Sequence, residues 1–110
     1  MADKWIEMLG QKLEQGDKLL NGYFAEHEGA KGWLALSQNR LFFIEESGGF
    51  LGKKYNLILD MPYAKIDKIA TEGNLKITVS EIGGRSHTFE SSGDIPAIEK
   101  KLKQLTVKKT

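Results

Sequence analysis

The sequence predicts a mainly β protein: a seven-stranded antiparallel sheet that closes into a barrel of two packed sheets, with one helix before it and one after it. Three observations predict this fold class. Apolar and polar residues alternate from residue 18 to residue 90, which is the period of a β-strand. Turn-forming residues interrupt the alternation at short intervals, and an amphipathic helical pattern follows the last strand. The 110 residues have the size of one domain.

The stretch before the sheet, at about residues 3–14, is predicted to be a short helix that Asp3 caps. Four apolar residues recur on one side of it at helical spacing: Trp5, Ile6, Leu9 and Leu13. Such a stripe must be buried, and it packs either on the chain's own barrel or against a second copy.

The predicted barrel covers about residues 18–91. Its first strand begins after Lys18 and places Phe24 and His27 on opposite faces. The next three strands are expected at residues 32–37, 40–46 and 53–60. The turn at residues 38 and 39 joins the first two of these, and a glycine-rich loop at residues 47–52 precedes the last.

Three more strands complete the predicted barrel, at residues 63–71, 75–80 and 85–90. Ile66 and Ile69 are three positions apart, which indicates a bend or bulge near the start of the first of them. A helix at about residues 94–106 follows, capped by Asp94. Its apolar stripe consists of Ile95, Ile98, Leu102 and Leu105, and we expect this stripe to cover an open side of the barrel.

Composition excludes several classes of protein. Cysteine is absent, so disulfides, zinc–thiolate sites and cysteine nucleophiles are excluded. Lys plus Arg is 16 and Asp plus Glu is 15, a balance that argues against nucleic-acid binding by bulk charge. No apolar run approaches the about 18 residues of a membrane span, and the N-terminus lacks the apolar core of a signal peptide. We therefore expect a cytoplasmic protein that needs no cofactor.

Two segments resemble a known family. Residues 32–44, GWLALSQNRLFFI, are similar to the pattern of apolar strand, turn, Arg and hydrophobic strand in bacterial pleckstrin-homology-like (PH-like) and GRAM-type domains. Residues 61–69, MPYAKIDKI, resemble another segment of that family, and the likeness spans about residues 18–105. The resemblance implies a seven-stranded barrel with a C-terminal capping helix and a role in interaction, with self-assembly as a trait of the bacterial members.

Several residues of these segments have predicted structural roles. Arg40 is expected to pair with a carboxylate across the sheet, and Tyr63 to plug the corner that Pro62 begins. The aromatic residues Trp33, Phe42, Phe43 and Phe89 are expected in the core.

Short matches to catalytic motifs lack the neighbouring residues or the secondary structure that those motifs require, so we predict no catalytic residue. The chain has two histidines, His27 and His87, and their spacing gives no reason to place them together, so no metal site is expected. His87 shares a strand face with Phe89, which indicates a partly buried, hydrogen-bonded side chain. A small enzyme that uses His87 remains a minor alternative.

The candidate binding residues belong to three loops, at about residues 28–31, 47–54 and 81–85. They are Lys31, Phe50, Leu51, Lys53, Lys54 and Arg85. In the PH-like layout these loops share one end of the barrel, where lysines could hold an anionic surface while Phe50 and Leu51 insert. The alternative is that Phe50 folds back over the barrel and the lysines are solvated. We predict a non-catalytic module that binds a protein partner or itself, with peripheral binding to an anionic membrane through residues 47–54 as the second hypothesis.

Overall fold

The computed structural model describes residues 4–49 and 52–107. Within this part of the chain, seven strands form one antiparallel sheet in the order β4-β3-β2-β1-β7-β6-β5. The strands are β1 (Leu19–His27), β2 (Ala30–Ser37), β3 (Arg40–Gly49), β4 (Gly52–Pro62), β5 (Ile66–Glu72), β6 (Lys76–Glu81) and β7 (Ser86–Glu90). Helix α1 (Lys4–Gly10) precedes them, the 3-10 turn η1 (Tyr63–Lys65) separates β4 from β5, and helix α2 (Ile95–Val107) ends the described chain.

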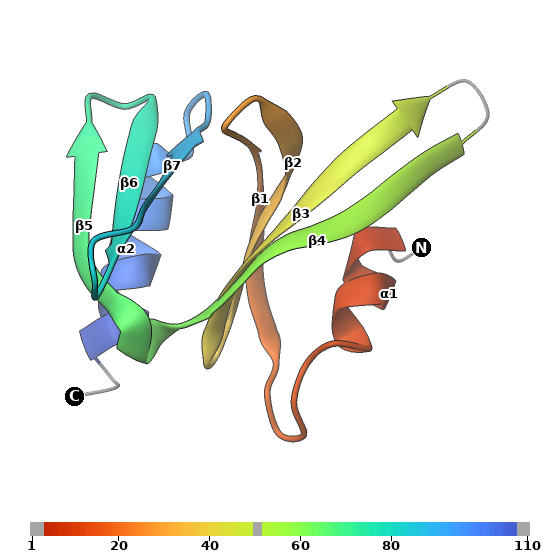
Figure 1. The fold of residues 1–110 in the computed structure, drawn as a ribbon, viewed down its shortest axis with the longest axis horizontal. Coiled ribbons are helices and arrows are strands. Elements are labelled where there is room, and N and C mark those ends of the chain that lie inside the picture. The colour runs from red at the N-terminus through yellow and green to blue at the C-terminus, as the bar shows by residue number, and fades with distance from the viewer. Residues whose placement is uncertain (1–3, 50–51, 108–110) are drawn as a thin grey trace.

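The sheet folds over at the junction of β1 and β7, so that β1–β4 and β5–β7 form two layers (Figure 1). Two register pairs join these strands, Glu26 with Glu90 and His27 with Phe89. β4 and β5 are the two edges of the sheet, and the chain passes from one to the other through η1. The predicted fold class, a mainly β barrel of two packed layers between two helices, is confirmed.

The space between the layers is filled by the inner core. Its members come from both layers and from α2, whose stripe of Ile95, Ile98, Leu102 and Leu105 is buried as predicted. From the strands it receives Ala25, Leu34, Leu36, Leu41, Phe43, Met61, Ile77, Val79 and Phe89, with Tyr63 from η1. Burying a large apolar side chain contributes about 1.5–3 kcal/mol, so α2 and the two layers stabilise one another.

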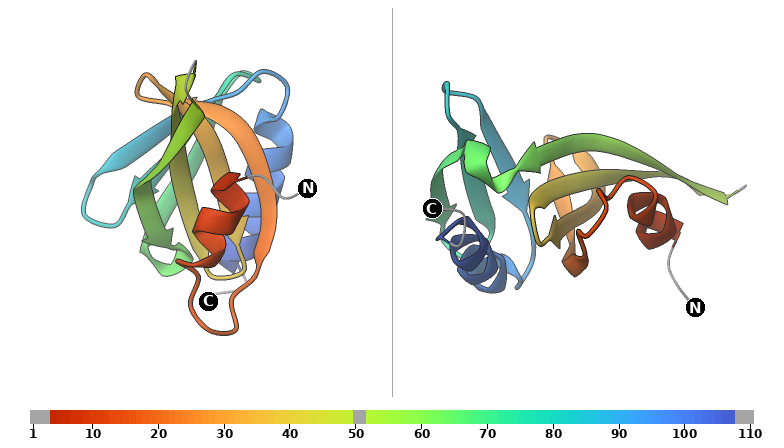
Figure 2. Two further views of the ribbon diagram at one scale, coloured as in Figure 1. Left: turned by 90° about the vertical axis from the view of Figure 1, so that its right-hand side faces the viewer. Right: turned by 90° about the horizontal axis from the view of Figure 1, so that it is seen from below.

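A second apolar cluster, the outer cluster, lies on the other face of the β1–β4 layer. Its buried members are Trp5, Leu9, Ala35, Phe42 and Ile44. Helix α1 lies across this face (Figure 2), and the indole of Trp5 stacks on that of Trp33 with ring centroids 5.0 Å apart. The stripe of the N-terminal helix is therefore buried on the chain's own sheet, which was one of its two predicted positions.

Gly22 on β1 makes this docking possible. A Cβ atom at Gly22 would lie 2.4 Å from Cη2 of Trp5, closer than real Cβ contacts come. The indole has no room to yield, because it is buried and stacked on Trp33. Glycine at this position therefore lets α1 approach the sheet closely.

The structure differs from the prediction at three boundaries. Helix α1 ends at Gly10 instead of residue 14, at a residue that disfavours a helix interior. The expected loop at residues 47–52 is mostly strand, because β3 and β4 stay paired as far as Gly49 and Gly52. Residues 63–65 are a 3-10 turn, and β5 begins at Ile66 with an irregular register, so the bend predicted there is present.

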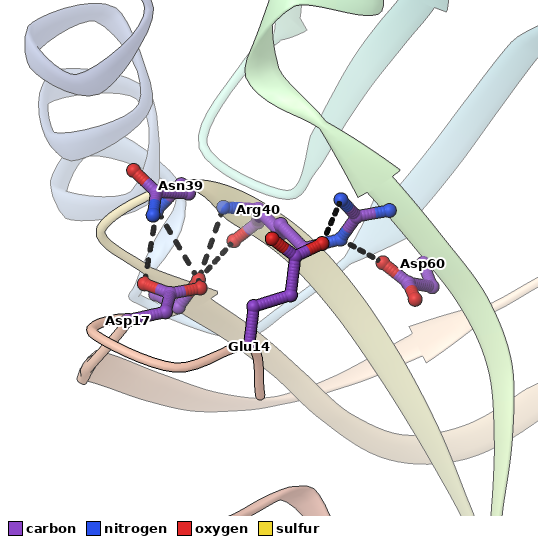
Figure 3. A network of polar contacts seen from close by, with 6 residues as sticks. Glu14, Asp17, Asn39, Arg40 and Asp60 are labelled. Atoms are coloured by element: carbon purple, nitrogen blue, oxygen red, sulfur yellow. Dashed lines mark hydrogen bonds and ion pairs between the residues drawn. The ribbon is translucent and has the colours of Figure 1, made fainter. Parts of the chain in front are cut away.

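The turn between β2 and β3 is held by polar contacts from the segment before β1 (Figure 3). The Asp17 carboxylate accepts a hydrogen bond from the Ser37 hydroxyl at 2.7 Å and another from the backbone N–H of Asn39 at 3.2 Å. The hydroxyl of Tyr63, a residue that is 2% exposed, donates to the carbonyl oxygen of Ser37 at 2.6 Å. Its partners come from two separate segments, the one before β1 and the turn η1, so this turn links both of them to the sheet.

Arg40 has the structural role that was predicted for it. Its Nε atom contacts Oδ1 of Asp60 on β4 at 2.5 Å, and its Nη1 atom lies 3.4 Å from Oε1 of Glu14 (Figure 3). Arg40 thus links β3, β4 and the segment after α1, and its guanidinium is engaged within the fold.

Candidate functional site

The predicted binding residues do not gather at one end of the molecule. Phe50 and Leu51 lie outside the described residues. Lys53 and Lys54 belong to the end of β4, which projects to the right in Figure 1, whereas the turn that carries Arg85 joins β6 and β7 on the left. Lys31 lies on β2 and lines a separate depression.

The positive charge of the β3–β4 hairpin is partly neutralised by its own strands. The ammonium group of Lys53 lies 3.4 Å from Oε2 of Glu46 on β3, and Oε1 of the same carboxylate accepts a hydrogen bond from Nε1 of Trp33 at 3.3 Å. Lys54 is exposed on the same strand. Of the basic residues that were predicted to converge, Lys53 and Lys54 are therefore the two that lie together in the described part of the chain.

An apolar groove, which we call the Phe24 groove, opens beside the junction of β1 and β7. Its volume is about 350 Å³. Phe24 on β1 and Leu75 in the β5–β6 turn line it, with 46% and 62% of their surface exposed. Ser91 links the two walls of the groove. Its hydroxyl donates a hydrogen bond to the carbonyl oxygen of Phe24 at 3.2 Å, and its backbone N–H donates one to the carbonyl oxygen of Leu75 at 3.0 Å.

A row of charged residues crosses the sheet beside the Phe24 groove. Glu26 and Glu90 are register partners across the junction, and Lys31 and Lys76 are their respective partners on the outer sides. Two carboxylates directly opposite each other repel. A basic group placed between them, next to the apolar walls, would relieve that repulsion.

A second depression, the histidine pocket, lies on the other side of the same junction. It has a volume of about 320 Å³, and it is lined by His27, Glu28, Ile58, Leu59, Arg85, Ser86 and His87. The rings of the two histidines have centroids 5.8 Å apart. The expectation that nothing brings the two histidines together is therefore wrong.

Both imidazoles of the histidine pocket are buried and oriented by hydrogen bonds. His27 is 7% exposed, and its Nδ1 donates to the carbonyl oxygen of Thr88 at 2.9 Å. His87 is 6% exposed, and its Nε2 donates to Oε2 of Glu81 at 2.6 Å. This hydrogen bond lowers the pKa of the Glu81 carboxyl, with further contributions from the charges of Arg85 and Lys65.

A signal for this cluster is present in the sequence, although the spacing of the two histidines does not reveal it. His27 directly precedes the loop at residues 28–31, and His87 closely follows the loop at residues 81–85. The resemblance placed these two loops at one end of the barrel, and in the structure β1 and β7 adjoin. The register of the junction then brings the two ends together. His87 thus lines a pocket and has an acidic neighbour, Glu81.

Solved structures show the same fold as this chain. A crystal structure of a pleckstrin homology domain from Shewanella amazonensis SB2B aligns with a TM-score of 0.64 and 18% identity, covering 94% of this chain and 96% of that one. The C-terminal domain of an unknown protein from Leishmania infantum aligns with a TM-score of 0.69 and 14% identity, covering 94% of each chain. The chain therefore has the PH-like fold, as the resemblance implied.

The other comparisons add no function to this fold. No protein-family model matches the sequence, and no curated protein matches it either. Within residues 4–49 and 52–107, neither helix is long and apolar enough to cross a membrane.

Proposed function

We propose that this chain is a non-catalytic interaction module of PH-like type that binds a segment of a partner protein in the Phe24 groove. The observation that carries the proposal is the pair Phe24 and Leu75, two large apolar side chains that are 46% and 62% exposed on the walls of one groove. Exposed apolar side chains that line a groove are typical of protein-binding surfaces.

The groove indicates the chemistry of its partner. The walls at Phe24 and Leu75 favour a large apolar side chain, and the facing carboxylates of Glu26 and Glu90 favour an adjacent Arg or Lys. We therefore propose a segment with an aromatic or aliphatic residue next to a basic one.

A displayed library of random peptides tests this proposal. Peptides selected on the full chain should carry the apolar–basic pair, and the binding of synthetic versions can be measured by fluorescence polarisation. Burial of a Phe or Leu side chain contributes about 1.5–3 kcal/mol. Phe24→Asp and Leu75→Asp should therefore each weaken binding at least about tenfold.

Ile82→Asp is the matched control, because Ile82 is 68% exposed and lines neither depression. It should leave peptide binding unchanged. Equal loss in all three variants, or no loss in any, would remove the groove as the site. If the wild-type chain dimerises in sedimentation experiments and Phe24→Asp alone abolishes the dimer, the occupant is a second copy of the chain.

A membrane surface is the second candidate, favoured by the position of Lys53 and Lys54 on a hairpin that extends away from the two layers (Figure 1). Sedimentation with vesicles containing phosphatidylserine tests it. Binding should weaken with salt, and it should be lost in Lys53→Glu/Lys54→Glu but kept in the control Lys100→Glu/Lys103→Glu on α2. Absence of sedimentation at low salt would refute this candidate.

A further inference from the structure

We propose that the histidine pocket is a binding site for a divalent transition-metal ion of the zinc class, with His27, Glu28 and His87 as ligands. One donor atom from each of the three residues lies within 4.8 Å of the other two. Two imidazoles and a carboxylate are ligands of zinc sites in proteins. This inference is independent of the Phe24 groove.

The distance between two of the three donor atoms is close to the one that a bound ion requires. Nε2 of His27 lies 3.7 Å from Oε2 of Glu28. In a tetrahedral site with bonds of about 2.0–2.1 Å, neighbouring donors are about 3.3 Å apart. The Glu28 side chain is 68% exposed and can move toward an ion. The three donors spread over up to 4.8 Å, so ion binding also requires the histidine rings to shift toward each other.

The hydrogen bonds of both rings leave the correct nitrogen for a metal. A carbonyl oxygen can only accept, so Nδ1 of His27 carries its proton and Nε2 is left with a lone pair on the Glu28 side. The Glu81 carboxylate accepts from Nε2 of His87, so Nδ1 is the nitrogen of that ring without this hydrogen bond, and we assign it as the ligand. Metal-binding histidines characteristically donate their other N–H to a carbonyl or carboxylate in this way.

The backbone at Glu28 gives separate support. Glu28 has φ 51°, and it is the non-glycine residue with positive φ in the described part of the chain. It precedes Gly29, with φ 85°, in the two-residue turn between β1 and β2. Asn or Gly suits this position better than Glu, so local turn geometry does not explain the residue.

The histidine pocket leaves room for a further ligand. Three protein ligands leave a fourth position of a tetrahedral ion open. Arg85 and Ser86 also line this pocket. Arg85 repels a bare cation, and an anion in the fourth position would satisfy both charges. Glu28 and Glu81 supply the negative charge that offsets the ion itself.

Calorimetry with Zn²⁺ on the untagged full chain tests the site. We expect one ion per chain at micromolar concentration, with Mg²⁺ unable to compete because it prefers oxygen ligands. Glu28→Asn should weaken zinc binding more than about tenfold. It should leave thermal stability equal or higher, since Asn suits the turn. Glu81→Gln, which acts on the orientation of His87, should weaken binding about 10–100-fold.

Glu72→Gln is the control and should leave zinc affinity unchanged. This carboxylate is at the end of β5 and pairs with Lys76, at the other end of β6 from Glu81. Nitrogen NMR of the imidazoles gives a sharper signature, since the sequence has two histidines. Zinc should shift Nε2 of His27 and Nδ1 of His87 and leave the other two nitrogens protonated. Binding weaker than millimolar, or affinity equal in Glu28→Asn and wild type, would mean that His27 and Glu28 form an ion pair only and would overturn the proposal.

Discussion

The inner and outer faces of the β1–β4 layer are covered to different extents. On the inner face, Leu34, Leu36 and Phe43 have no exposed surface, because a second layer and α2 close over them. On the outer face, Phe42 and Ile44 are equally buried, yet Phe24 on the same layer is 46% exposed.

The length of α1 explains the difference. Its seven residues form a rod about 10 Å long. Four strands spaced about 4.8 Å apart present a face wider than that, so one short helix leaves a margin uncovered. The margin at Phe24 is part of the groove for which we propose a binding role. One sheet thus uses its inner face to hold the fold and leaves part of its outer face available for contacts.

The largest loss of stability is expected when a side chain of the inner core is truncated. Phe89→Ala should lower the free energy of unfolding by about 3–5 kcal/mol, because Phe89 is fully buried and contacts the rings of Phe43 and His27. Urea unfolding measures this loss. A loss below about 1 kcal/mol would contradict the assignment of Phe89 to a closely packed core.

A smaller loss is expected where the outer cluster meets α1. Gly22→Ala should cost about 1–3 kcal/mol, since the added methyl group meets the indole of Trp5. Because Trp5 and Trp33 stack, tryptophan fluorescence should shift to the red as α1 detaches. The same substitution at exposed Gly49, where a Cβ would meet nothing within 4 Å, is the control.

The smallest loss of stability is expected from Trp5→Phe, which makes the ring at position 5 smaller. Trp5→Phe should cost less than Phe89→Ala, because it also removes a buried indole N–H that has no hydrogen-bond partner among the described residues. In this background Gly22→Ala should lose most of its cost, since the ring atoms that it meets are absent. Additive losses in the double variant, measured by a double-mutant cycle, would show that the two positions are not in contact.

Local sequence patterns predicted the secondary structure well because they depend on neighbouring residues. The strands and α2 follow from alternation and from a helical stripe, and the role of Arg40 followed from its place at the start of a strand. The bend after Pro62 was also visible, since Ile66 and Ile69 break the alternation. The length of the β3–β4 hairpin was not visible in the sequence, because glycines are compatible with both loop and strand.

The candidate sites were harder to predict because they depend on which strands adjoin. Lys31 and Arg85 were expected beside Lys53, but they line different depressions. His27 and His87 were treated separately, and the junction of β1 and β7 brings them together.

Hydrophobic periodicity in the sequence was enough to predict a two-layered β protein closed by a C-terminal helix, because each element must bury its apolar face. Which side chains meet at the β1–β7 junction, and how much of the outer face α1 covers, became visible only in the folded chain. Both depend on register and on close approach between residues far apart in the chain, and a single residue such as Gly22 can permit or prevent that approach.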